Sequence, residues 1–192
     1  MRAVRFHANP AAVLLLVLLY SSLENRELAA LLSAVLVHEL GHLAALCLLG
    51  LQLCELRLEL TGLCIRYAGH PSRWGQCLTA AAGPALGLIY AQLASAAGLE
   101  LAAGLSLLLS LFNLLPVRPL DGWQMAASFC TGTYSGRVLN AIGLFTALLL
   151  LSFGIVCARQ GKGYALCIVG ACLLLSQLFS DYYTGMNGRI QG

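Results

Sequence analysis

The chain consists largely of apolar runs separated by short polar stretches. Each run reaches or approaches the ~20 residues that a helix needs to cross a bilayer core of about 30 Å. The runs occupy roughly residues 6–23, 28–49, 75–97, 101–116, 138–157 and 164–180. This pattern predicts an all-α polytopic membrane protein with about six transmembrane helices. The first run has a short apolar core and no clear cleavage site after it, so we expect a retained helix, whether spanning, tilted or partly interfacial.

The period of the pattern changes after Gly50. Residues 51–60 alternate between apolar and polar side chains, Thr61-Gly62 interrupts them, and an extended apolar pattern resumes over 63–67. Alternation with a period of two is typical of a strand, so this stretch predicts a short membrane-associated β-hairpin after the second span. The hairpin is either a substrate-binding edge or gate, which an unpaired strand edge permits, or a simple connector.

Composition agrees with a membrane protein. Of 192 residues, 59% are apolar and 10% are charged, whereas soluble domains carry roughly 25% charged residues. The net charge of +3 is small, and we expect no nucleic-acid partner.

Arginine and lysine predict the orientation of the six spans. Eight of the eleven basic residues fall on one side of the predicted topology. They are Arg2, Arg5, Arg57, Arg66, Arg73, Arg118, Arg137 and Arg189. Because positive charge favours the cytoplasmic side, both termini are predicted to be cytoplasmic.

The candidate chemistry begins with His38-Glu39-Leu40-Gly41-His42, in the middle of the second apolar run. A charged or strongly polar side chain at membrane depth costs at least ~2.5 kcal/mol, so such residues usually face the protein interior and have a function. Two histidines four apart project from one face of a helix, with the glutamate in reach of the same region. This is the H-E-x-x-H zinc arrangement.

A second polar constellation runs from Asn113 to Gly122, at the cytoplasmic end of the fourth run. Pro116 and Pro119 cannot continue a helix, so this stretch is predicted to be extended or looped at membrane depth. A catalytic zinc commonly takes three protein ligands, and an H-E-x-x-H pair lacks the third. Asp121 is the best candidate for it. The alternative is that Asp121 is the N-cap of a helix over residues 122–129.

Gly83 and Pro84 interrupt the third run. Proline removes a backbone hydrogen bond and glycine allows helices to touch, so the pair predicts a kink with close packing. Either packing alone explains the pair, or the pair leaves room beside the site.

Together these motifs resemble the site-2 protease family of intramembrane zinc metalloproteases. The similarity rests on the H-E-x-x-H motif, on Gly83-Pro84 and on Asn113-x-x-Pro116-x-x-Pro119-Leu120-Asp121-Gly122. Within the family the chain looks most like the sporulation branch, which processes a membrane-associated sigma-factor precursor. The resemblance implies one Zn²⁺ per chain.

The resemblance also implies a role for each matched residue. His38, His42 and Asp121 would bind the zinc, Glu39 would be the catalytic base, and Asn113 would help to line the site. Gly83, Pro84, Pro116 and Pro119 are further candidates for lining the site.

The chain departs from the family pattern in two places. Trp123 stands where the family often has a second glycine. Sporulation-type members often carry a CBS domain after the last span, and we expect none in this sequence. Residues 1–192 are therefore predicted to form a single intramembrane metalloprotease domain. Its catalytic core covers roughly 28–130, and spans five and six follow.

The resulting hypothesis is a zinc-dependent endopeptidase in a bacterial cell membrane. It would cut transmembrane or membrane-associated proteins near the cytoplasmic side, because His42 lies about seven residues, or roughly 10 Å, from the inner end of its span. A membrane inhibitor or regulator is a possible partner, and the oligomeric state is not indicated. The alternatives are a proteolytically silent binding or retention factor of the same fold, and a metal transporter.

Overall fold

The computed structural model describes residues 5–59, 62–69, 71–161 and 164–187. Within these ranges the chain forms seven helices and a three-stranded sheet. It divides into two compact units, residues 1–113 and 114–192. The ends of the chain, residues 1–4 and 188–192, lie outside the described residues, so their predicted cytoplasmic location stays a prediction.

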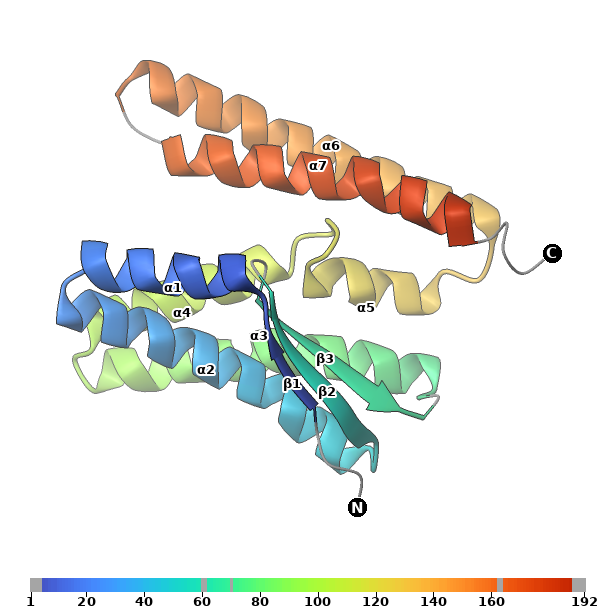
Figure 1. Ribbon diagram of the computed structural model, residues 1–192, viewed down its shortest axis with the longest axis horizontal. Coiled ribbons are helices and arrows are strands. Elements are labelled where there is room, and N and C mark those ends of the chain that lie inside the picture. The colour runs from blue at the N-terminus through green and yellow to red at the C-terminus, as the bar shows by residue number, and fades with distance from the viewer. Residues whose placement is uncertain (1–4, 60–61, 70, 162–163, 188–192) are drawn as a thin grey trace. The chain divides into compact units, whose positions relative to one another are not determined.

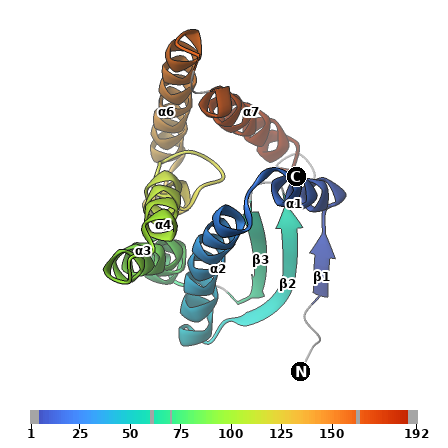
Figure 2. The same cartoon turned by 90° about the vertical axis from the view of Figure 1, so that its left-hand side faces the viewer.

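The first unit combines the sheet with four helices (Figure 1). Its elements in chain order are β1 (Arg5–Ala8), α1 (Pro10–Ser22), α2 (Asn25–Leu48), β2 (Gln52–Glu59), β3 (Gly62–Ala68), α3 (Arg73–Ala96) and α4 (Glu100–Asn113). The helices α2, α3 and α4 pack against one another, and the sheet lies beside α2 (Figure 2).

The second unit contains α5 (Asp121–Phe129), α6 (Thr133–Arg159) and α7 (Tyr164–Asn187). Helices α6 and α7 pack along each other (Figure 1), and α5 contacts α6. Small residues make the α6–α7 contact close, because a Cβ on Gly154 would lie 2.8 Å from the backbone nitrogen of Cys167.

The predicted hairpin is confirmed. Strands β2 and β3 pair antiparallel from Gln52 opposite Ala68 to Glu59 opposite Gly62. The prediction of an all-α fold with a hairpin alone was wrong in one respect, because β1 adds a third strand that pairs parallel to β2.

The extra strand explains why the first helix is shorter than the predicted run 6–23. Proline fits the first position of a helix but disfavours helical conformation in the residue before it. Helix α1 accordingly begins at Pro10, and the residues before Asn9 are free to pair with β2.

The buried face of the first unit is built from small residues. One cluster of buried apolar residues in its helices consists of Ala30, Ala94, Ala102 and Ala103. Large apolar side chains such as Leu36, Ile89 and Leu108 point outward and are more than half exposed. Small residues inside and large ones outside are typical of helices that pack in a bilayer, because lipid accepts an exposed leucine as readily as a core does.

Among the described residues, three helices are long and apolar enough to cross a membrane, namely α2, α3 and α6. Residues 12–22, 100–113 and 166–179 form shorter apolar helices. All six predicted apolar runs therefore contain a helix, and the count of six complete spans stays a prediction.

The crossing of α2 and α3 has no spare space at Gly41. A Cβ at this position would overlap the backbone oxygen of Ala82 and lie 2.9 Å from Gly83 Cα. Gly41→Ala is therefore expected to force the helices apart and to lower the free energy of unfolding by about 1–3 kcal/mol. Reversible unfolding in mixed detergent micelles measures this change.

Gly104→Ala is the matched control, since Gly104 also lies within a helix but a Cβ there would meet nothing within 4 Å. We expect this variant to change the free energy of unfolding by no more than about 1 kcal/mol. Equal effects of the two substitutions would contradict a tight crossing at Gly41.

Candidate metal centre

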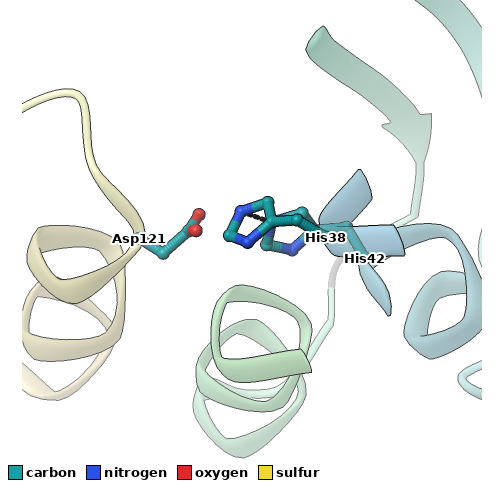
Figure 3. Close-up of side chains that lie close together, drawn as sticks. All are labelled: His38, His42 and Asp121. Carbon is teal, nitrogen blue, oxygen red and sulfur yellow. Dashed lines mark hydrogen bonds between the residues drawn. The ribbon is translucent and has the colours of Figure 1, made fainter. Parts of the chain in front are cut away.

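The two histidines of the H-E-x-x-H motif lie side by side on α2 (Figure 3). Their Nε2 atoms are 3.2 Å apart, and their ring centroids are 4.9 Å apart. His38 is buried, with 4% of its surface exposed, on the same helix face as Ala34, Gly41 and Ala45. The predicted placement of the two imidazoles on one face of the helix is thus present.

A backbone carbonyl of α3 orients His42. The Nδ1 atom of His42 lies 2.8 Å from the carbonyl oxygen of Thr79. A carbonyl can only accept, so Nδ1 carries the proton and donates it. In the neutral ring the lone pair is then on Nε2, the atom that faces His38. Metal-binding histidines are commonly held by such a hydrogen bond from the second ring nitrogen.

Gly83 makes room for the His42 ring. A Cβ at residue 83 would overlap Nε2 and lie 2.8 Å from Cδ2 of His42. Pro84, the next residue of α3, is fully buried. Of the two explanations for Gly83-Pro84, packing alone or space beside the site, the contacts favour the second for the glycine.

The spacing of the histidine nitrogens fits a zinc ion. Zinc binds imidazole nitrogen at about 2.0–2.1 Å in tetrahedral geometry, which places two ligand nitrogens about 3.3 Å apart. The observed separation of 3.2 Å is close to this value. Glu39 is half-buried on the same turn of α2, between the two histidines in sequence.

Asp121 begins α5 in the second unit and is buried (Figure 3). The alternative that Asp121 caps a helix over 122–129 was wrong in register. Leu120 is the N-cap residue, and Asp121 is the first residue of the helix. The carboxylate thus stands in the first turn of α5, where negative charge is favourable.

The segment between α4 and α5 is looped, as its two prolines predict. The N–H of Val117 donates to the Leu115 carbonyl and that of Leu120 donates to the Val117 carbonyl, both at 2.8 Å. Gly122 allows this loop to lie against α5, because a Cβ there would overlap the carbonyl oxygen of Leu114. The backbone of the loop therefore approaches α5 closely at Gly122.

Asn113 and Trp123, near the two ends of this loop, each make a contact. Asn113 is the last residue of α4, and its side-chain amide donates to the Leu109 carbonyl of the same helix at 3.0 Å. Trp123, which replaces the second glycine of the family pattern, lies under the guanidinium of Arg118, 4.1 Å from ring centroid to Cζ. The large ring therefore anchors the loop to α5 through a cation–π contact.

Comparison with known proteins gives a similarity to a solved structure. No protein-family model and no curated protein matches the sequence. A solved structure, the site-2 protease from Methanocaldococcus jannaschii, is similar over 92% of this chain and 90% of its own chain, with a TM-score of 0.66 and 22% sequence identity. The chain has the fold of a site-2 protease. The recognised resemblance is thus confirmed for the fold, and the sporulation branch stays a prediction.

Sequence reasoning missed the role of Thr79. The residue acts through its backbone carbonyl, which every amino acid has, so its side chain carries no signal. The nearby Gly83 was the available clue, since it marks where α3 comes close enough to α2 for a carbonyl to reach a histidine.

Gly83→Ala tests whether the space that Gly83 leaves for the His42 ring matters for metal binding. The added methyl group would displace the imidazole from its hydrogen bond with Thr79, so zinc affinity is expected to fall about 10- to 100-fold. Competition with a chromophoric zinc chelator measures the affinity. Gly104→Ala should leave the zinc affinity unchanged. Wild-type zinc affinity in Gly83→Ala would show that the space at Gly83 has no part in metal binding.

Proposed function

We propose that this chain is an intramembrane zinc metalloprotease that hydrolyses peptide bonds of membrane-embedded or membrane-associated proteins. The observation that carries the proposal is the pair of histidines, buried His38 and half-buried His42, whose Nε2 atoms are 3.2 Å apart, with His42 oriented by the Thr79 carbonyl. The shared fold with a solved site-2 protease supports the assignment.

His38, His42 and Asp121 are the ligands in this proposal, with one zinc per chain. Together they offer two imidazole nitrogens and a carboxylate oxygen, a donor set that suits catalytic zinc and leaves a fourth position open. Zinc bound there would activate water and polarise the scissile carbonyl.

Glu39 is the general base. It takes the proton of the attacking water and delivers it to the leaving amine, which completes the cleavage of the amide bond. Its place on α2, next to His38 in sequence, ties the base to the same helix as two of the ligands.

The substrate class follows from the membrane setting. A helical segment hides its peptide bonds, so a transmembrane substrate must unwind locally before it is cut. Strand β3 lies at one edge of the described sheet and could pair with such an extended segment. Membrane-tethered regulators, among them a sigma-factor precursor, are the substrates that the family resemblance favours.

Glu39→Gln separates catalysis from metal binding. Glutamine keeps the size of the side chain but cannot accept the proton, so proteolysis should fall at least about 100-fold while zinc content stays at one per chain. Quantitative proteomics of membranes from cells with either form would identify the proteins that accumulate uncut, and elemental analysis would measure zinc.

His38→Ala is the companion variant, expected to lose zinc and activity together. If cells with Glu39→Gln show the same membrane proteins, equally processed, as cells with the wild-type chain, the protease assignment fails. A proteolytically silent binding factor would then be the better description.

Asp121→Asn tests the third ligand. The amide is a poor zinc ligand, so affinity should fall at least about 10-fold, as measured by chelator competition. Glu100→Gln is a matched control. Like Asp121, Glu100 lies in the first turn of a helix, but its side chain is exposed. Equal zinc affinities for Asp121→Asn and the wild-type chain would remove Asp121 from the ligand set.

A further inference from the structure

Helix α7 carries two adjacent polar residues, Ser176 and Gln177, within its apolar stretch 166–179. A polar side chain in a membrane helix is costly unless it finds a partner, and it usually faces the protein interior. Gln177 is 6% exposed and Ser176 is half-buried. Both side chains are thus directed into the second unit, where their contacts can be traced.

Ser176 reaches the loop between α4 and α5. Its hydroxyl lies 2.7 Å from the carbonyl oxygen of Arg118, 58 residues earlier in the chain. The hydroxyl also lies 2.8 Å from the Leu173 carbonyl of its own helix. The long-range contact joins the middle of α7 to the residue between the two loop prolines.

Gln177 approaches the same loop beside Gly143 of α6. A Cβ on Gly143 would overlap Nε2 of Gln177 and lie 2.9 Å from the carbonyl oxygen of Pro116. The amide of α7 and the first proline carbonyl therefore both lie against Gly143. Only a residue without a side chain leaves space there for two polar groups.

The loop needs such partners. Pro116 and Pro119 prevent a helix, so the carbonyls between them cannot be satisfied by regular helical hydrogen bonds. In a membrane, unsatisfied backbone groups are costly, so irregular segments persist only where the protein supplies partners. The hydroxyl of Ser176 supplies one for Arg118, two residues before α5 begins with its N-cap Leu120.

We propose that Ser176 and Gln177 are positioning residues that hold the backbone of residues 116–118 and thereby set where Asp121 presents its carboxylate. This inference rests on the proposed function, in which Asp121 is a zinc ligand. The chain of contacts is short. Ser176 holds the Arg118 carbonyl, the Arg118 guanidinium covers Trp123, and Asp121 lies between these two points in the sequence.

The test uses Ser176→Ala in the full-length chain, with Ser152→Ala as a matched control. Ser152 donates only to the Leu149 carbonyl of its own helix, so its removal costs the local contact without the long-range one. Ser176→Thr restores the hydroxyl. Gln177→Leu is the second variant, since it removes the amide but keeps an apolar side chain in the interface.

Two measurements read out the effect without relying on proteolysis. The first is zinc affinity by chelator competition. The second is quenching of Trp123 fluorescence by acrylamide in a Trp74→Phe background, which leaves Trp123 as the single tryptophan. Circular dichroism verifies that each variant is folded.

We expect Ser176→Ala and Gln177→Leu to weaken zinc binding about 10-fold and to increase Trp123 quenching. Ser152→Ala and Ser176→Thr should behave like the wild-type chain. Wild-type zinc affinity in folded Ser176→Ala overturns the proposal, and so does an equal loss in Ser152→Ala.

Failure of the proposed function would look different. In that case His38→Ala would bind zinc as the wild-type chain does, and the metal site itself would be wrong. Trp123 quenching alone then decides whether Ser176 holds the loop, with an increase in Ser176→Ala supporting that contact and no change overturning it.

Discussion

The hydrogen bond from His42 Nδ1 to the Thr79 carbonyl depends on the close crossing of α2 and α3, and the candidate metal centre depends on both. Gly41 on one helix and Gly83 on the other remove the side chains that would keep the two backbones apart. The ring of His42 then fits over Gly83 with its second nitrogen toward His38. A larger residue at either glycine would both push the two helices apart and disturb the orientation of His42.

Small residues are also found at other contacts between the described helices. Alanine, glycine and serine occupy many of the contacts between helices, while large side chains such as Leu36 and Ile89 are exposed. In water this arrangement would expose the wrong side chains, but in lipid an outward leucine loses nothing. Close contact between backbones in turn lets carbonyl groups act as partners. Thr79 accepts from His42 in the first unit, and Arg118 accepts from Ser176 in the second.

How much the sequence could predict depended on whether a feature has a period or a distinctive residue. The apolar runs follow from their length of about 20 residues. The hairpin follows from an alternation with a period of two, and the pairing of His38 with His42 from their spacing of four residues. All three have counterparts in the structure. Strand β1 has four residues, too few for alternation to be recognised, and its pairing with β2 is long-range. Thr79 acts through its main chain, so nothing in its side chain could have indicated a role.

Ser176 and Gln177 belong to an intermediate case. Two adjacent polar residues in an apolar helix are a visible signal, yet their partner could be identified only when the loop carbonyls were located 58 residues away. The start of α5 was also only partly predictable. Capping rules place Asp121 just before the helix, whereas the structure places it within the first turn.

The central claim, that α2 presents two imidazole nitrogens to one zinc ion, is tested most directly by X-ray absorption spectroscopy at the zinc edge of the purified, zinc-loaded protein. We predict a four-coordinate ion with two imidazole ligands at about 2.0–2.1 Å, one of which disappears in His42→Ala. A zinc spectrum without imidazole scattering, or one that His42→Ala leaves unchanged, would contradict the account.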